Sequence, residues 1–273
     1  MLISQRLAKL NEQKGNFHIC LVYSISPYCT RFAIYFGEFQ TGTFLFVNHF
    51  TQFFPDTLWA WLTFLGNGWG VFALAFPLLL LAPRMLTAGI FAGGIAALAS
   101  IVLKGFFDLP RPAGVLTDGS FYRIGEALLY RAFPSGHTLT AFAIASALYF
   151  SVTKEKRGPF MSLFLVAALV GLSRTAVGAH WLTDVLGGAG VGIWCGMLGA
   201  LAANQFPENQ LGSKKIWSHL IALGGVVAIY AHLTQIMDLE LNLPLQYVSI
   251  AILASTLIFY VKAQFTHAPR KAE

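Results

Sequence analysis

Residues 85–103 read MLTAGIFAGGIAALASIVL, a run that contains no charged residue. A transmembrane helix needs about 20 apolar residues, so this run is long enough to cross a bilayer. The rest of the chain has the same character: 56% of its 273 residues are hydrophobic and 11% are charged. A soluble domain carries about 25% charge, and disorder requires low hydrophobicity. The composition therefore excludes a soluble globular enzyme and a disordered chain, and it indicates a membrane protein.

Other uncharged stretches of similar length predict further spans, over residues 57–83, 132–153, 158–173, 185–207, 216–237 and 241–261. An eighth segment, residues 17–36, contains Pro27 and Arg31 and is expected to be a retained anchor rather than a signal peptide, because no small-residue cleavage site precedes its aromatic run. Lipid does not tolerate unpaired backbone, so the predicted fold class is all-α: a polytopic transmembrane helical bundle. Neither a repeat nor a linker divides residues 1–273, which predicts a single domain.

The positions of Lys and Arg predict the orientation, because these residues favour cytoplasmic loops. If the N-terminus is cytoplasmic and all eight segments cross, the basic residues on the cytoplasmic side are Arg84, Lys154, Lys156, Arg157, Lys214, Lys215, Lys262, Arg270 and Lys271. The basic residues that break the rule, on the outer side, are Lys104, Arg111, Arg123, Arg131 and Arg174. So many cations on the wrong side suggest that function, and specifically an anion, holds them there.

Three polar clusters meet this same outer face, at residues 104–112, 134–137 and 173–184. They lie at the outer ends of different spans and are far apart in sequence. Their convergence on one membrane boundary predicts a single site assembled from several helices. Elsewhere, the tract 37–56 is expected to be an interfacial segment, and Glu126–Tyr130 a short helix guarding the site.

The cations of these clusters are suited to phosphate. Lys104, Arg111 and Arg174 would repel one another unless something negative lay between them. Arginine offers a planar fork that matches phosphate oxygens, and lysine offers a point charge. Ser135-Gly136 begins a helix, where free backbone N–H groups and the helix dipole favour an anion. The pattern indicates a phosphate-binding cradle.

Two histidines accompany the cradle. His180 and Asp184 are four residues apart, hence neighbours on one helical face, and the carboxylate can fix the tautomer of the imidazole. His137 comes from another helix and could act as a general acid. Together the two imidazoles and the cradle predict phosphoryl transfer through a phosphohistidine. The cysteines Cys20, Cys29 and Cys195 have no metal-like spacing and predict neither a zinc site nor a disulfide framework.

The order and spacing of the motifs resemble the complete signature of the type-2 phosphatidate phosphatase superfamily. The matching elements are Lys104 with six residues to Arg111-Pro112, Pro134-Ser135-Gly136-His137, and Ser173-Arg174 with five residues to His180 and three more to Asp184. They cover residues 104–184, and the sequence departs from the pattern at none of these positions. The superfamily includes membrane lipid phosphatases, glucose-6-phosphatase and soluble vanadium haloperoxidases.

The resemblance implies a role for each residue. His180 would be the nucleophile and Asp184 its orienting partner, while His137 would protonate the leaving oxygen and then activate water. The residues that would hold the phosphate oxygens are Lys104, Arg111, Ser135, Gly136 and Arg174. No metal or other cofactor is expected, because three cations and a helix start supply the charge stabilisation. The resemblance implies a core of six helices, with residues 216–263 adding up to two extra spans.

The sequence thus predicts an integral membrane phosphatase acting on a lipid phosphate monoester or pyrophosphate at the extracytoplasmic face. Its expected partners are the lipid phosphate substrate and the bilayer, and not nucleic acid. The outer segments lack N-glycosylation sequons, which fits a bacterial inner membrane with the site facing the periplasm. Three alternatives stay open: a lipid-to-lipid phosphotransferase, an anion transporter, and a haloperoxidase, although haloperoxidases of the superfamily are soluble.

Overall fold

A computed structural model describes residues 37–265, so the anchor expected at residues 17–36 lies outside the described part of the chain. The described residues fall into two units, 37–43 and 44–265. Residues 37–43 are helical, and the Thr43 hydroxyl donates a hydrogen bond to the Phe39 carbonyl oxygen at 2.9 Å. The second unit carries every residue of the predicted site. The prediction of one domain over residues 1–273 stays a prediction.

Within residues 44–265 the secondary structure is helical throughout, with no strand. Residues 44–51 are helical, and the helices that follow are α2 (Asp56–Phe64), α3 (Gly68–Ala75), α4 (Leu78–Leu81), α5 (Pro83–Phe107), α6 (Gly136–Phe150), α7 (Met161–Ala176), α8 (Leu182–Gln205), α9 (Ile216–Thr234) and α10 (Leu243–Phe265). Short 3-10 turns lie between them, including η4 (Glu240–Asn242) just before α10. The predicted all-α class is confirmed.

Within residues 37–265, four segments are long and apolar enough to cross a membrane: Pro83–Gly114, Leu182–Gln205, Ile216–Thr234 and Glu240–Phe265. A fifth is added if the bent pair α2 and α3 counts as one span. The chain is therefore an integral, multi-pass membrane protein. Helix α6, of 15 residues, is shorter than the uncharged stretch 132–153 in which it was predicted, and α7, of 16 residues, starts later than the stretch 158–173 and ends later, at Ala176. Prolines set their starts, because Pro134 precedes α6 by two residues and Pro159 precedes α7 by two.

The prediction of one continuous span over residues 57–83 is wrong. The segment is divided into α2, α3 and α4, and α2 and α3 meet at 71°. The break has a local cause, because the Asn67 side chain caps α3 by accepting hydrogen bonds from the backbone N–H groups of Trp69 and Gly70. Pro77 then lies at the N-cap position, just before α4. The bend lets α2 pack on α7 while α3 packs on α9 and α10.

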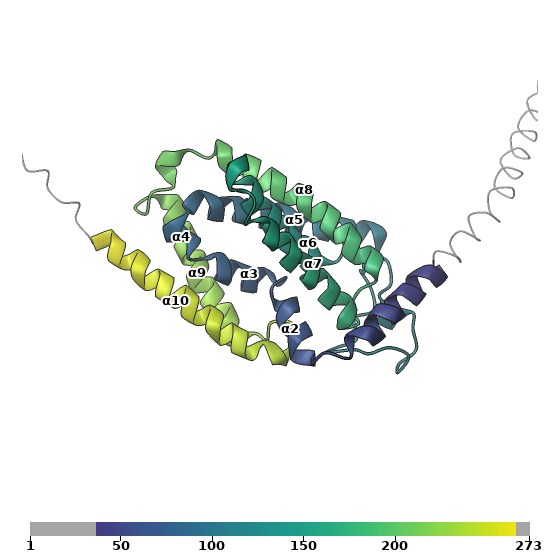
Figure 1. Cartoon of the computed structure of the whole chain (residues 1–273). Helices are drawn as coiled ribbons and strands as arrows, with labels where there is room; N and C mark the ends of the chain where they lie inside the picture. The colour runs from purple at the N-terminus through teal and green to yellow at the C-terminus, as the bar shows by residue number, and fades with distance from the viewer. Residues whose placement is uncertain (1–36, 266–273) are drawn as a thin grey trace, which may run out of the picture. The chain divides into compact units, whose positions relative to one another are not determined.

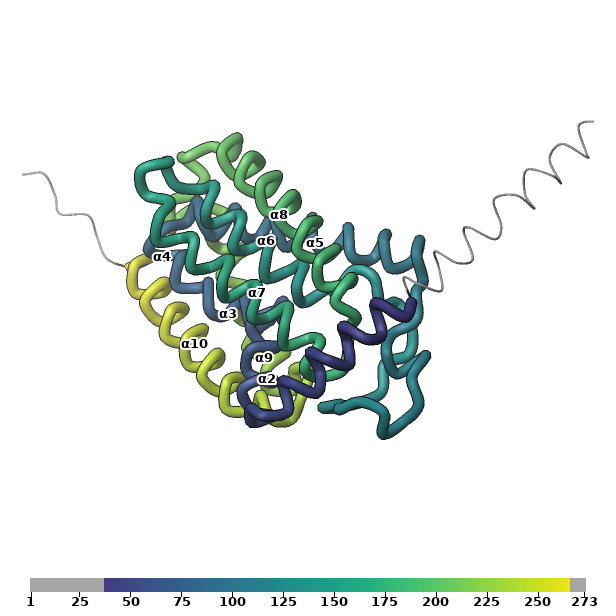
Figure 2. The backbone as a smooth tube through the Cα atoms, turned by 45° about the vertical axis from the view of Figure 1, so that its right-hand side comes forward, coloured from purple at the N-terminus to yellow at the C-terminus, as the bar shows by residue number. Residues whose placement is uncertain are grey.

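Helix α6 lies at the centre of the bundle and packs against α5, α7 and α8 (Figure 1). Helices α9 and α10 pack against each other, and α3 contacts both. Figure 2 follows the same path as a tube: the connection from α5 to α6 leaves the helices at the end where α7 stops and α8 starts. The ends of four helices thus come together at one end of the bundle.

Glycines bring α8 unusually close to α6. A Cβ atom on Gly188 would lie 2.7 Å from the Ser135 carbonyl oxygen, and one on Gly192 would lie 2.5 Å from that of Leu139. Small residues allow membrane helices to approach backbone to backbone in this way. The spacing matters for function because the two helices carry predicted site residues in their first turns.

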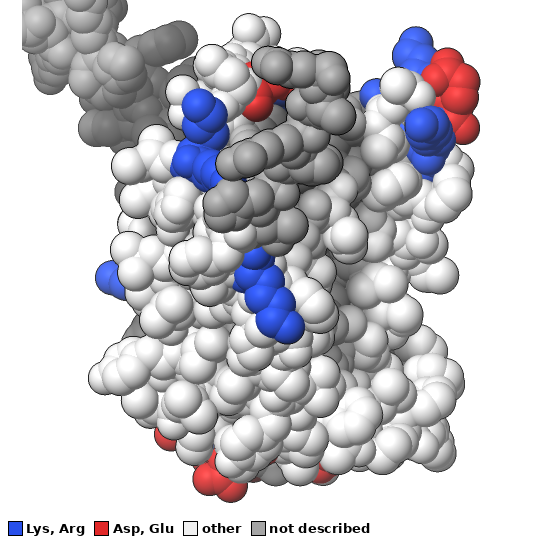
Figure 3. Space-filling model, turned by 90° about the vertical axis from the view of Figure 1, so that its left-hand side faces the viewer, with Lys and Arg blue, Asp and Glu red and all other residues white. Residues whose placement is uncertain are grey.

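Charge differs between the two ends of the bundle. Arg84 begins α5, and the connections at the same end carry Lys154, Lys156, Arg157, Lys214 and Lys215. Most of the face seen in Figure 3 is uncharged; its Lys and Arg side chains lie in the upper and middle parts, whereas only Asp and Glu mark its lower edge. The three predicted clusters lie at the end opposite to Arg84, because α5 separates Arg84 from Lys104.

The close approach of α8 and α6 predicts a specific sensitivity to added volume. Gly192→Ala is expected to lower the thermal unfolding midpoint in detergent, since overpacking costs about 1–3 kcal/mol. Gly190→Ala is the matched control, because a Cβ atom there meets no atom within 4 Å. Tryptophan fluorescence against temperature measures both. Equal midpoints for the two variants would contradict the packing described for this helix pair.

Candidate active site

His180 lies in the turn between α7 and α8, where it is 1% exposed. Its Nδ1 lies 3.3 Å from Oδ2 of Asp184, and the same oxygen accepts a hydrogen bond from the Trp181 backbone N–H at 3.0 Å. On the other side of the ring, Nη1 of Arg111 lies 3.2 Å from Nε2. A guanidinium only donates, so these partners assign the hydrogen to Nδ1 and a lone pair to Nε2. The imidazole is held in the tautomer that a nucleophile requires.

The turn that presents His180 depends on a glycine. Gly178 has a φ of +75°, and a Cβ atom there would lie 2.6 Å from the Tyr122 carbonyl oxygen. The chain then folds back, so that the Arg174 carbonyl oxygen accepts from the backbone N–H groups of both Ala179 and His180. A side chain at position 178 would meet both a strained backbone and a steric clash.

Arg111 is held by backbone carbonyl groups. Its Nε donates to the Tyr130 oxygen at 2.8 Å and its Nη1 to the Ala179 oxygen at 3.3 Å, while its backbone N–H donates to Leu129. The expectation of a short helix at Glu126–Tyr130 is wrong, because this segment is irregular. The carbonyl groups of Leu129 and Tyr130 bind Arg111, so they are not available to a helix. They hold the guanidinium against His180.

Lys104 and the start of α6 lie close together. A Cβ atom on Gly136 would lie 3.8 Å from Nζ of Lys104, so the ammonium group faces the free N–H groups of the first turn of α6. Ser135 is fully buried, its hydroxyl accepts from the Thr138 hydroxyl at 2.9 Å, and its backbone N–H donates to the Asp184 carbonyl oxygen at 3.0 Å. These contacts join the second and third motifs directly.

Arg174, near the end of α7, is 6% exposed. Its Nη1 lies 3.4 Å from the Thr63 hydroxyl of α2, and its Nε has no hydrogen-bond partner among the described residues. Leaving a buried charged donor unpaired is costly. The unpaired Nε is therefore suited to an anionic ligand, for which arginine is the preferred partner.

The electrostatics of His180 reflect this convergence. Burial lowers the pKa of His180 well below its ordinary value, and the charges of Arg111, Arg174 and Lys104 lower it further. The charge of His137 acts on it in the same direction. Cations from the first and third motifs therefore surround one imidazole, which is neutral at neutral pH.

His137, in the first turn of α6, pairs with a residue outside the predicted set. Its Nε2 lies 3.0 Å from Oδ1 of Asp238, in the loop between α9 and α10. The other carboxylate oxygen, Oδ2, accepts from Nδ2 of Asn67 at 3.0 Å. Burial raises the pKa of Asp238, but His137, Arg174 and Asn67 outweigh it and hold that pKa below its ordinary value. Asp238 is absent from the predicted set because no local motif marks it.

Two further residues, outside the predicted set of site residues, brace the site. Asn48 is fully buried; its Nδ2 donates to the Thr175 and Ala176 carbonyl oxygens, and its Oδ1 accepts from the Tyr122 backbone N–H. Trp181 donates from Nε1 to the Pro110 carbonyl oxygen at 2.9 Å. Asn48 thereby ties α7 to the α5–α6 connection, and Trp181 ties that connection to α8.

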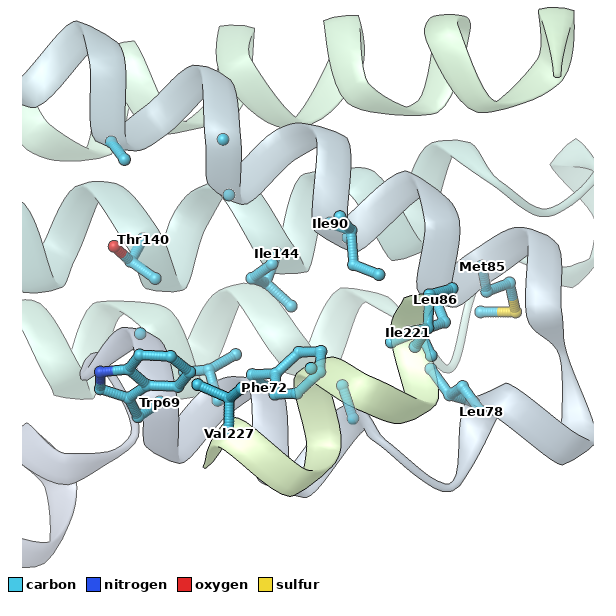
Figure 4. A pocket seen from close by; sticks show the side chains of 18 of the residues that line it. Trp69, Phe72, Leu78, Met85, Leu86, Ile90, Thr140, Ile144, Ile221 and Val227 are labelled. Atoms are coloured by element: carbon cyan, nitrogen blue, oxygen red, sulfur yellow. The ribbon is translucent and has the colours of Figure 1, made fainter. Parts of the chain in front are cut away.

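An apolar cavity of about 900 Å³ begins beside this cluster. Helices α3, α5, α6 and α9 line it, and Figure 4 shows Thr140 and Ile144 of α6 opposite Trp69 and Phe72 of α3. Thr140 is one helical turn from His137, and Asn67 also lines the cavity. The cavity runs along α5 from Ala97 to Met85, about 18 Å at 1.5 Å per residue.

Comparison with known proteins identifies the family. A family model of the PAP2 superfamily matches residues 85–209. The crystal structure of LpxE from Aquifex aeolicus is 33% identical in sequence, with a TM-score of 0.50, over 58% of this chain and 93% of that one. The chain belongs to the PAP2 superfamily. The resemblance drawn from the motifs is confirmed.

Two curated relatives match shorter stretches of this PAP2 protein. Lipid A 1-phosphatase of Porphyromonas gingivalis is 46% identical over 70 residues, which are 25% of this chain and 15% of that protein. Phosphatidylglycerophosphatase B of Bacillus subtilis is 33% identical over 109 residues, which are 37% of this chain and 49% of that protein. The chain thus spans at most half the length of these two relatives.

The cations around His180 predict a shift in the pH dependence of any reaction that needs this imidazole neutral. Since the pKa of His180 is lowered, the acid limb of kcat/KM is expected below about pH 6.5, the ordinary histidine value. Arg111→Gln removes one of the cations and should move that limb to higher pH. Phosphate release from a phosphate monoester across pH measures it.

All variants are compared on one substrate, so the ionisation of the substrate affects every pH profile equally and does not contribute to the differences between them. Arg123→Gln is the control, because Arg123 pairs with Asp118 at 3.2 Å outside the cluster. An acid limb that stays in place in Arg111→Gln, or that moves equally in both variants, would contradict the electrostatic account of His180.

Proposed function

We propose that this PAP2 protein is an integral membrane phosphatase that releases phosphate from a lipid phosphate monoester or pyrophosphate. The observation that carries the proposal is the buried, neutral imidazole of His180, held between Asp184 and Arg111 with a lone pair on Nε2. Such an atom, surrounded by cations, is suited to attack phosphorus. The names of the two relatives, lipid A 1-phosphatase and phosphatidylglycerophosphatase B, support a lipid phosphate as the substrate.

In the first step Nε2 of His180 attacks phosphorus, and the bond from phosphorus to the leaving oxygen breaks. His137 donates a proton to that oxygen, which leaves as a hydroxyl group or, from a pyrophosphate, as a phosphate. Asp184 accepts the Nδ1 hydrogen bond and stabilises the positive charge that develops on the ring of His180. The phosphoryl group is then bonded to Nε2 of His180.

In the second step His137, now neutral, takes a proton from water. The resulting oxygen attacks phosphorus, the bond from phosphorus to Nε2 breaks, and inorganic phosphate is released. His180 returns to its neutral form and His137 to its protonated form, so the cycle closes. General acid and base catalysis of this kind contributes roughly 10²- to 10⁴-fold in rate.

Side chains and backbone supply the charge stabilisation in this proposal. Lys104, Arg111 and Arg174 neutralise the phosphate oxygens, and the backbone N–H group of Gly136 lies at the positive end of the α6 dipole, whereas the Ser135 N–H is taken by the Asp184 carbonyl oxygen. The unpaired Nε of Arg174 supports such a ligand. The reaction is expected to proceed without a divalent metal.

The apolar cavity supports a lipid. A phosphate bound between His180 and His137 would lie within one helical turn of Thr140, where the cavity begins. A single aliphatic chain could then extend along α5 toward Met85 between apolar walls. About 900 Å³ lies near the upper end of the range for small-molecule sites, roughly 300–1,000 Å³.

The extracytoplasmic face is supported by charge. The cluster around His180 lies at the end of the bundle opposite to Arg84, Lys154 and Lys214. Cytoplasmic loops are enriched in such residues, so the site would face the other side of the membrane. For a bacterial inner membrane, that side is the periplasm.

The direct test is phosphate release from a lipid monophosphate by purified protein in detergent with EDTA present. The wild type is expected to be active, and His180→Ala is expected to lose activity by at least about 10³-fold, because the nucleophile is gone. His219→Ala is the matched control, because His219 is an exposed histidine at the start of α9.

Equal rates for wild type and His180→Ala would end the proposal of a histidine nucleophile. A strict requirement for added magnesium would end the proposal of metal independence. Loss of activity in His219→Ala would show that the assay reports stability rather than chemistry.

The cavity predicts chain-length selectivity that one substitution can remove. A Cβ atom on Gly93 meets nothing within 4 Å, so Gly93→Leu would extend into the cavity. The ratio of kcat/KM for a long-chain lipid phosphate to that for a short-chain analogue is expected to fall about tenfold, equivalent to ~1.4 kcal/mol. Gly190→Leu, on the exposed side of α8, should leave the ratio unchanged. An unchanged ratio in Gly93→Leu would contradict this use of the cavity.

A further inference from the structure

Asp238 reaches the site from outside the part of the chain that matches the PAP2 superfamily, which ends at residue 209. Its side chain is 19% exposed, and its Oδ1 atom lies 3.0 Å from Nε2 of His137. Asn67 donates to the other oxygen at 3.0 Å. The extra C-terminal helices α9 and α10 therefore contribute, through their connecting loop, a carboxylate to the predicted general acid.

Buried amides hold this loop in one conformation. Gln246, 1% exposed, accepts from the Met237 backbone N–H and donates to the Gln235 carbonyl oxygen. Asn242, fully buried, donates to the Met237 carbonyl oxygen. Asp238 itself has a φ of 63°, a left-handed conformation uncommon for any residue but glycine. The backbone around Asp238 is thus fixed independently of its carboxylate.

The loop is also fastened to the helix that braces Arg174. Trp61 of α2 donates from Nε1 to the Leu241 carbonyl oxygen at 3.2 Å, and Phe64 of α2 packs with Met237. Thr63, between them, is the residue that contacts Arg174. The position of Asp238 is therefore set by the same element that sets one wall of the phosphate cradle.

The groups that face His137 differ in charge. Burial opposes protonation of the imidazole most, the charges of Arg174 from α7 and Lys104 from α5 oppose it further, and His180 faces it across the cluster. Asp238 is the carboxylate that favours the protonated ring. Removing this carboxylate would leave burial and the two cations unopposed, so a smaller share of His137 would hold the proton that a general acid must donate.

We propose that Asp238 is a positioning residue that favours the protonated form of His137 and fixes which nitrogen reacts. Its Oδ1, 3.0 Å from Nε2, stays beside that nitrogen throughout the cycle, and Nδ1 is the atom that gives its proton to the leaving oxygen and later takes one from water. Asp238 remains a carboxylate in both steps. The proposal rests on the proposed phosphatase function and adds the C-terminal hairpin to its machinery.

The test compares two substrates that differ in their need for a general acid. An alkyl monophosphate has a poor leaving group that must be protonated, whereas p-nitrophenyl phosphate has a good one that needs little help. Asp238→Asn, which keeps an amide oxygen for Asn67, is expected to lower kcat for the alkyl substrate by about tenfold or more, within the contribution of general acid catalysis. The loss for p-nitrophenyl phosphate should be much smaller.

The ratio of the two rates does not depend on how much of the protein is folded, so a merely structural role would leave it unchanged. Glu240→Gln is the matched control, because Glu240 is an exposed acid two residues along the same loop. It should behave as wild type in both assays. An equal loss on both substrates in Asp238→Asn would overturn the proposal, and so would a gain in activity, which would mean that the carboxylate competes with phosphate.

The pH profile is a second readout. Because Asp238→Asn removes the negative charge that offsets Arg174 and Lys104, the alkaline limb of the rate for the alkyl substrate should move to lower pH. An unmoved limb would overturn the proposal. His180→Ala separates the two hypotheses: if it is inactive while Asp238→Asn is normal, only the role of Asp238 fails, whereas activity in His180→Ala removes the proposed function itself.

Discussion

The hydrogen bonds of Asp184 connect the packing of the helices to the chemistry of the site. One carboxylate oxygen lies 3.3 Å from His180 Nδ1 and accepts from the Trp181 backbone, while the Asp184 carbonyl oxygen accepts from Ser135 at the start of α6. This arrangement requires α8 to lie almost against α6, and Gly188 permits the approach. The first turns of two helices, and with them two of the three motifs, are thereby fixed relative to each other.

Irregular segments bring the remaining residues of the site to this junction of α6 and α8. Arg111 is held by the backbone of the α5–α6 connection, His180 by the turn at Gly178, and His137 is contacted by the α9–α10 loop through Asp238. Loops placed by a rigid scaffold commonly carry function, because they can turn polar groups toward one point. In this protein the scaffold includes α9 and α10, beyond the residues that match the family model.

The sequence predicted the helical class and the residues that converge, because uncharged runs and three spaced motifs are local signals. It did not predict the division of residues 57–83, since a single cap at Asn67 outweighs the continuous hydrophobicity there. It also did not predict the contacts of Asp238 and Asn48, which are polar residues whose partners lie far away along the chain. Long-range contacts of this kind leave no periodic or spaced pattern that a single sequence can reveal.

The central claim is that His180 takes the phosphoryl group, and trapping that species tests it most directly. Protein mixed with a lipid phosphate, quenched in alkali within one turnover and digested should yield a peptide with phosphate on His180. The same peptide from His180→Ala should carry none, and slowing the second step with His137→Ala should change how much accumulates. Rapid turnover with no phosphorylated peptide, or with the phosphate on another residue, would contradict the account.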